Sequence, residues 1–328
     1  MTKERHPIIL RHPEFLAILL FLAVDTVWSS ILGINFIDYG RILAATSGLL
    51  LIGSYYGFSG RSERLAEMGY YGAAWISFSA TGAVLTYLAA YMRTPLYDSA
   101  FAEIDAALGF SWPIWFELGS TNVVIDLLLR IAYHSLIFQI LGSIIFFAHT
   151  KRTDRNKELF WAAAISLAIT SAIAYAYPAV GAFYHFKIEV QRAVHLQHVF
   201  DLIAGTQPIY SFRDMQGIVT FPSYHAALAV IFMYVYRGFR RAFPFAVALN
   251  TFMLISTPAN GGHYLIDVIA GSVVAAVSVL LLRHAAPRLS RSTLHMRLVP
   301  QAASNPFLNS SSHRGAADCL SNEVRDTR

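Results

Sequence analysis

One short stretch, GGHYLID, places an imidazole and a carboxylate four residues apart at the start of an apolar run. The two residues are His263 and Asp267, preceded by Gly261 and Gly262. On a helix, residues four apart lie one turn apart on the same face, so the carboxylate can accept a proton from Nδ1 of the ring. This contact leaves Nε2 with a free lone pair and stabilises positive charge on the ring. The spacing therefore predicts His263 as a nucleophile and Asp267 as the residue that orients it.

A second stretch, FPSYHAALAV, opens another apolar run with Pro222, Ser223 and His225. Proline suits the first turn of a helix, and a serine hydroxyl there can cap the helix or bind a ligand. Helix N-termini attract anions through unpaired N–H groups and the positive end of the helix dipole. His225 has no carboxylate at a matching spacing, so its predicted role is that of a general acid. Ser223 and Gly262 are predicted to contact the anion, Gly262 because it has no side chain in the way.

The composition is that of a membrane protein. Of the 328 residues, 55% are hydrophobic and 14% are charged, and the mean hydropathy is +0.48. A soluble domain carries about 25% charged residues. Several apolar runs reach the roughly 20 residues that a helix needs to cross a bilayer, where the backbone must satisfy its own hydrogen bonds. The predicted fold class is all-α, an integral membrane bundle of about eight transmembrane helices.

Hydropathy divides the chain into a short N-terminal segment (1–13), a transmembrane bundle (14–283) and a polar tail (284–328) that is predicted to be disordered. Trp112 and Trp115 lie in the connection 93–121, which is predicted to form a helix in the membrane interface. The predicted spans are 14–33, 41–58, 71–92, 122–149, 159–181, 223–239, 244–260 and 264–283.

Lysine and arginine follow every second predicted span, in the loops near 61–64, 151–158, 237–241 and 283–291. Basic loops mark the cytoplasmic side of a membrane, so both termini are predicted to be cytoplasmic. His225 and His263 then begin their spans at the opposite, extracytoplasmic face, where they can share one site. The formal net charge of +5 is explained by these loops and by contact with anionic lipid, and needs no nucleic-acid partner.

With this site in place, PSYH and HYLID resemble the second and third signature motifs of the type-2 phosphatidic acid phosphatase superfamily, over about residues 120–283. The resemblance implies a membrane enzyme that transfers phosphoryl groups through a phosphohistidine, without a metal or other cofactor. It implies His263 as nucleophile, His225 as general acid, Asp267 as the orienting aspartate and Ser223 in the phosphate pocket. The substrate that it implies is a lipid phosphate.

Two features depart from the phosphatase pattern. Thr257 stands where the third motif usually has an arginine, and the lysine and Arg-Pro pair of the first motif have no clear match in 182–222. The form HYxxD without that arginine looks more like the inositol phosphorylceramide synthase and sphingomyelin synthase branch. Arg213 is the predicted replacement for the missing cations, with Lys187 and Arg192 in the same loop. Arg130, four residues after Asp126, is a candidate for either packing or phosphate contact.

Three alternatives stay open on the sequence alone. The acceptor of the phosphoryl group can be water, which makes a lipid phosphatase, or a second lipid alcohol, which makes a phosphotransferase. The bundle could also be a non-catalytic lipid transporter, although the sequence shows no internal repeat of the kind that transporters carry. His185, His195 and His198 match no standard zinc spacing, so no metal site is predicted.

Overall fold

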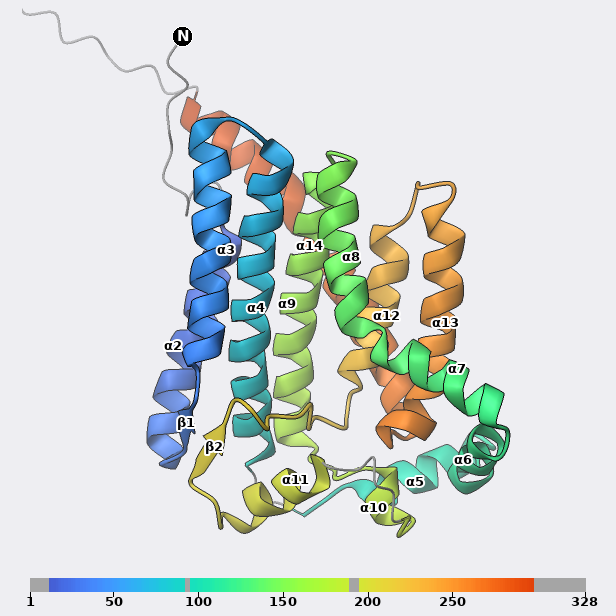
Figure 1. Ribbon diagram of the computed structural model, residues 1–328. Coiled ribbons are helices and arrows are strands. Elements are labelled where there is room, and N and C mark those ends of the chain that lie inside the picture. Colours follow the sequence, from blue (N-terminus) through green and yellow to red (C-terminus); the bar gives the residue numbers. More distant parts are fainter. Residues whose placement is uncertain (1–11, 92–94, 189–194, 298–328) are drawn as a thin grey trace, which may run out of the picture. The chain divides into compact units, whose positions relative to one another are not determined.

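The computed structural model describes residues 12–91, 95–188 and 195–297. The chain divides into two units, residues 1–285 and 286–328, and the following concerns the first. The prediction of an all-α membrane bundle is confirmed (Figure 1). Its long helices are α2 (Glu14–Leu32), α3 (Gly40–Ser59), α4 (Glu63–Ala90), α7 (Val123–His134), α8 (Leu136–His149), α9 (Thr153–Ala176), α12 (Tyr224–Val235), α13 (Ala242–Gly261) and α14 (Leu265–Arg297).

The number of spans differs from the predicted eight. Among the described residues, six helices are long and apolar enough to cross a membrane, or seven if α7 and α8 count as one bent span. The remaining predicted span, 223–239, contains α12, which is apolar but has only 12 residues. At about 1.5 Å per residue this helix falls short of the roughly 30 Å hydrocarbon layer.

The predicted span 122–149 is not one straight helix, because α7 and α8 meet at an angle of 52°. Ser135 stands at the junction and its hydroxyl donates to the carbonyl of Ala132. A serine hydroxyl that competes for a backbone carbonyl favours a bend in the helix. As Figure 1 shows, α7 leaves the direction of α8 and runs across to α13, against which it packs extensively. The bend therefore moves α7 toward the end of α13.

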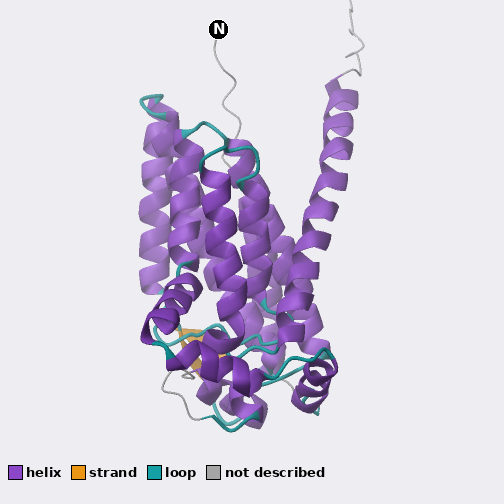
Figure 2. Ribbon diagram, turned by 90° about the vertical axis from the view of Figure 1, so that its right-hand side faces the viewer, coloured by secondary structure: helices purple, strands orange, loops and turns teal. Residues whose placement is uncertain are grey.

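The two ends of the bundle differ in structure and charge. The loops that follow α3, α8 and α12 lie together at one end (Figure 1). The basic residues in these loops are Arg61, Lys151, Arg152, Arg237, Arg240 and Arg241, and Arg64 follows in the first turn of α4. The opposite end gathers short elements, which Figure 2 shows clustered below the long helices. They are α5 (Asp98–Ala107), α6 (Trp112–Thr121), α10 (Ala182–His185) and α11 (His195–Ala204). The predicted interfacial helix is thus two helices, broken around Gly109, whose φ is 77°.

A small parallel strand pair was not predicted. Strand β1 (Asn35–Ile37) follows α2 and pairs with β2 (Ile209–Ser211), with Phe36 opposite Tyr210. Each strand has three residues, too few to show an alternating pattern. The pair is held by packing, because buried Tyr210 lies against Phe36 and Tyr87. It connects the N-terminal helices to the connection 182–222.

The core lies where α4, α9 and α12 meet. Aromatic side chains from α4 and α9, including Trp75, Phe78 and Phe160, pack beside alanines of α9 and α12. Small residues let helix backbones approach closely, which is how helices associate in a membrane. The core therefore fixes α12 against the rest of the bundle.

The predicted tail differs from the structure at its start, since α14 is helical as far as Arg297. The rest of the predicted tail with Cys319, the N-terminal segment 1–11 and Arg192 lie outside the described residues.

Candidate functional site

His263 lies between α13 and α14 and is only 5% exposed. Its Nδ1 is 2.9 Å from the carbonyl oxygen of Thr220 and 3.3 Å from Oδ2 of Asp267. Both partners are acceptors, so Nδ1 carries the proton and donates, and Nε2 keeps its lone pair. The predicted contact between His263 and Asp267 is therefore present. The closer acceptor is the Thr220 carbonyl, which the sequence analysis missed because a backbone group 43 positions away leaves no local pattern.

Asp267 joins the two halves of the site. Its Oδ2 accepts the N–H of Tyr264 (2.8 Å), which ties the carboxylate to the start of its own helix. Its backbone carbonyl accepts the N–H of Ser223 (3.0 Å), at the start of α12. The serine hydroxyl lies 3.4 Å from Nε2 of His263 and also accepts the N–H of Ala226. The structure thus brings three predicted residues, His263, Asp267 and Ser223, into one hydrogen-bonded group.

Gly271 permits this close approach of α12 and α14. A Cβ added at Gly271 would lie 2.2 Å from the backbone oxygen of Ser223, which is too close for any side chain. The sequence analysis did not single out this glycine, although a glycine within a helical run signals close packing.

His225 faces the same region from the first turn of α12. Its ring stacks on Tyr133 of α7, with centroids 4.4 Å apart and an interplanar angle of 12°. It lies within electrostatic reach of His263 and His134. A Cβ on Gly261 would meet both the His263 ring and the Tyr133 hydroxyl at 2.7 Å. Tyr133 therefore lies close to the turn that carries His263 and also stacks on His225. Because of the bend after His134, α7 contributes to the site.

The N-terminus of α14 is closed by Asp105 of the interfacial helix α5. The carboxylate accepts the N–H groups of Leu265 (2.7 Å) and Ile266 (2.9 Å). Burial raises the pKa of Asp105, and these two hydrogen bonds act in the opposite direction. The N–H groups of Leu265 and Ile266 are therefore not free to bind an anion. At α12, the N–H groups of Tyr224 and His225 have no partner among the described residues.

Two more residues of this interfacial region hold the turn that carries His263. Asp98 accepts the N–H groups of Val180 (3.0 Å) and Gly181 (2.8 Å) and the hydroxyl of Tyr264 (2.9 Å). Trp112 donates its indole N–H to the carbonyl of His263 at 3.0 Å. The tryptophan predicted as an interface anchor thus also fixes the backbone of the candidate nucleophile.

Gly262 has the left-handed backbone that ends α13, with φ of 66°. A Cβ there would lie 2.4 Å from the ring of Phe183, and the carbonyl accepts the N–H of Ala182. The space in which a ligand was expected is filled by Phe183. In this structure Gly262 serves the turn and the packing of α10.

Burial controls the charge of His263. Loss of solvent lowers the pKa of the imidazole to about 4, against the opposing effect of the Thr220 hydrogen bond. The ring is therefore neutral near pH 7, and the Nε2 lone pair is available to attack an electrophile.

The candidate cations lie in different places. Arg213 is more than half exposed, with Nε 3.7 Å from Oδ2 of Asp38 beside the strand pair, and no hydrogen bond or ion pair joins it to His225 or His263. Lys187 follows α10. Arg130 lies one turn before Tyr133 on α7, is hydrogen-bonded to Asp126, and keeps 41% of its side chain exposed. Of the two arginines, Arg130 is on the element that reaches the histidines.

The remaining histidines of the loop have other contacts. His198 shares a hydrogen bond of 2.7 Å with the hydroxyl of Tyr87, and the ring of His185 lies edge-on to Phe186. No group of three potential metal ligands occurs within 12–91, 95–188 and 195–297.

The helices form an all-α membrane bundle, and His225 and His263 lie toward one end of it. A family model described as the PAP2 superfamily matches residues 99–281, more than half of the chain, and the chain belongs to this superfamily. Membership supports a phosphatase-type lipid phosphoesterase in general. Comparison with curated proteins and with solved structures finds no match. The matched segment begins after α4 and contains His225, His263, Asp267, Ser223 and Asp105, whereas Asp98 lies one residue before it.

Asp105→Asn is expected to lower both thermal stability and activity. Asparagine offers one acceptor to two buried N–H groups, and an unsatisfied buried group costs about 1–3 kcal/mol. The displaced turn would also move His263. Thermal unfolding and turnover of the purified protein measure the two effects. Glu103→Gln on the exposed face of the same helix is the control and should change neither. An unchanged melting temperature in Asp105→Asn would contradict the role of Asp105 in holding the start of α14.

Proposed function

We propose that the protein is a lipid phosphatase that works through a phosphohistidine on His263. The observation that carries the proposal is the state of the imidazole. Its Nδ1–H donates to the Thr220 carbonyl and to Asp267. Its Nε2 faces the Ser223 hydroxyl, and no backbone N–H among the described residues occupies the Nε2 lone pair. A neutral ring in this tautomer is prepared for attack on phosphorus.

In the first step, Nε2 of His263 attacks the phosphorus atom and the bond to the lipid alcohol oxygen breaks. His225 gives its proton to that oxygen as it leaves. In the second step, His225 takes a proton from water, the water oxygen bonds to phosphorus, and the P–N bond breaks to release phosphate and neutral His263. The position of the two histidines supports this division of roles, because His225 stacks on Tyr133 and the Tyr133 hydroxyl and the His263 ring both lie beside Gly261.

The negative charge on phosphorus needs donors that are already in position. The free N–H groups at the start of α12 and the hydroxyl of Ser223 supply neutral ones. Arg130 is our proposed cation, in preference to Arg213, because α7 carries it to within one turn of Tyr133. The half-buried His225 and the exposed part of Arg130 mark the side from which the headgroup would approach.

We further propose that the site faces the extracytoplasmic side and takes its substrate from that leaflet. The basic loops gather at the end of the bundle opposite the site, as expected for a cytoplasmic end. A single cysteine placed at exposed Gln207 tests this orientation. An impermeant thiol reagent should label it in intact cells, and labelling only after lysis would reverse the assignment.

One observation favours the second candidate, a phosphotransferase like the inositol phosphorylceramide synthases. Thr257 is fully buried and donates its hydroxyl to the carbonyl of Met253, so it supplies no charge to the site. A phosphate monoester carries nearly two negative charges and a diester carries one. A site with fewer cations therefore loses less charge stabilisation with a diester than with a monoester. The phospho-headgroup of the diester lipid would then pass to a second lipid alcohol.

His263→Ala is expected to abolish turnover, since it removes the nitrogen that forms the P–N bond in the proposed mechanism. Asp267→Asn should lower kcat by roughly 10–100-fold, less than the about 10⁴-fold loss of a sole orienting carboxylate, because the Thr220 carbonyl still holds Nδ1–H. Both are measured with purified, folded protein, and trapping of labelled phosphate on the wild-type chain would identify the intermediate. Substantial turnover by folded His263→Ala would refute the nucleophile.

Arg130→Gln is expected to reduce kcat/KM by about 100-fold, the usual loss when one charge-stabilising donor is removed. Arg130→Lys should recover part of the activity, because the positive charge remains. The matched control is Arg213→Gln, which should stay near the wild-type value. If Arg213→Gln is the more damaging variant, the phosphate-binding cation lies in the connection 182–222 instead.

A labelled donor lipid distinguishes water from a lipid alcohol as acceptor. With hydrolysis as the main reaction, soluble phosphate appears at the same rate whether or not ceramide or diacylglycerol is present. Acceptor-dependent labelled lipid with little soluble phosphate would establish the phosphotransferase instead. His263→Ala controls for background in both assays.

A further inference from the structure

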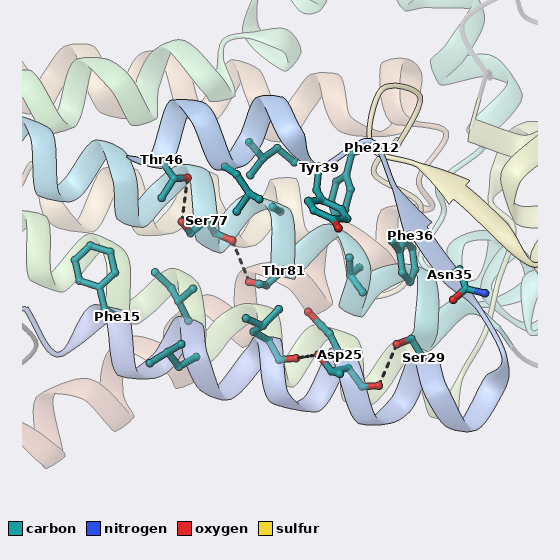
Figure 3. Close-up of a pocket in the computed structure, with 18 of the residues that line it drawn as sticks. Phe15, Asp25, Ser29, Asn35, Phe36, Tyr39, Thr46, Ser77, Thr81 and Phe212 are labelled. Atoms are coloured by element: carbon teal, nitrogen blue, oxygen red, sulfur yellow. Dashed lines mark hydrogen bonds between the residues drawn. The ribbon is translucent and has the colours of Figure 1, made fainter. Parts of the chain in front are cut away.

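The N-terminal helices enclose a cavity that the proposed reaction does not use. α2 and α3 each pack along α4 but have little direct contact with one another. Between them lies a cavity of about 870 Å³, bounded at the end nearest β1 by Asn35, Phe36 and Phe212 (Figure 3). Apart from Phe212, every lining residue precedes residue 99, where the family match begins. The cavity therefore belongs to a part of the chain that is separate from the histidine site.

The cavity opens toward the lipid rather than toward water. Three of its lining residues, Leu19, Leu22 and Leu43, are 53%, 49% and 55% exposed on helices that qualify as membrane spans. Its walls are mostly aliphatic and aromatic. A volume of about 300–1,000 Å³ is typical of a site for one small ligand. A single hydrocarbon chain from the bilayer could enter between α2 and α3.

One charged residue lines this cavity, and it is Asp25 of α2. The residue is 4% exposed, and neither carboxylate oxygen has a hydrogen-bond partner within the part of the chain that the structure describes. It lies seven residues before the end of α2, at roughly 10 Å from that end. An unpartnered carboxylate at this depth is costly and marks a functional site by default.

The neighbouring hydroxyl groups do not satisfy Asp25. Thr26 and Ser30 donate to carbonyls of α2 itself, and Thr81, on the facing helix α4, donates to the carbonyls of Ser77 and Phe78. Figure 3 shows Asp25 and Thr81 on opposite walls of the cavity. A molecule in the cavity that donates hydrogen bonds would therefore satisfy Asp25.

The lining decides the charge of this molecule. The lining contains an acidic group and no lysine, arginine or histidine, so an anionic phosphate headgroup would be repelled. A protonated amine would supply both the hydrogen-bond donors and the compensating charge. From Asp25 to Phe15 the lining of α2 extends for about 15 Å, which matches a chain of roughly a dozen methylene groups.

We propose that the cavity between α2, α3 and α4 binds a single-chain membrane amphiphile through an amine headgroup that donates to Asp25. The chain lies along α2 toward Phe15, against the floor formed by Ala80 and Thr81 of α4. The site is independent of the proposed phosphoryl transfer, so either can fail without the other.

Binding of radiolabelled dodecylamine tests the proposal. The full-length protein is placed in nanodiscs of zwitterionic lipid, and binding to empty nanodiscs is subtracted. We expect saturable binding of one amine per protein. Dodecyl phosphate should not compete for the site, and dodecanol should compete at least tenfold less well than the amine. Equal competition by either compound would overturn the assignment of an amine headgroup.

Three variants give the structural controls. Asp25→Asn should weaken amine binding at least tenfold without lowering the melting temperature, because it removes a buried carboxyl group that has no protein partner among the described residues. Ala80→Phe fills the cavity and should abolish binding even though Asp25 is present. Glu67→Gln removes a half-buried carboxylate of α4 outside the cavity and should bind the amine like the wild type. Unchanged binding by Ala80→Phe or Asp25→Asn would overturn the proposal.

Discussion

The hydrogen bond from Nδ1 of His263 to the backbone carbonyl of Thr220 is the constraint on which the site depends. It selects the tautomer in which Nε2 has a lone pair, and it holds the turn after α13 against the segment that leads into α12. The backbone bond from Ser223 to Asp267 completes this junction. Since the acceptor is a main-chain carbonyl in both bonds, neither bond depends on the side chain of Thr220, Ser223 or Asp267. Gly271 makes the junction possible, because any side chain there would push α12 and α14 apart.

Helices α5 and α6 act as a clamp on this junction. Asp98 and Asp105 each accept two backbone N–H groups, and Trp112 donates to the carbonyl of His263. Exposed carboxylates usually accept hydrogen bonds from water. These two carboxylates instead turn inward and accept protein N–H groups, and they thereby fix the position of the backbone around His263. The clamp also explains why α14 does not offer its N-terminus to an anion. The anion site that we propose falls instead on α12, Ser223 and Arg130.

The histidine site and the cavity with Asp25 lie in different parts of the chain. Residues 99–281 contain the histidine site and belong to the PAP2 superfamily. Helices α2, α3 and α4 come before this segment, and the strand pair β1–β2 connects them to it. Their open packing leaves the cavity with Asp25. A separate amphiphile site on an added helical layer would let the membrane's composition act on the protein without contact with the histidines.

The sequence by itself determined what depends on short-range pattern. Long apolar runs predict membrane helices because lipid forces the backbone to bond within each segment, and the spacing of His263 and Asp267 predicts their contact because a helix repeats every 3.6 residues. The tertiary structure alone decided which distant groups meet. It put the Thr220 carbonyl on His263, Asp105 on the end of α14 and Tyr133 on His225, and it bent α7 so that Arg130 rather than Arg213 lies on an element of the site. These contacts join segments separated by tens of residues or more. No local period records such contacts, since they are set by how whole helices pack.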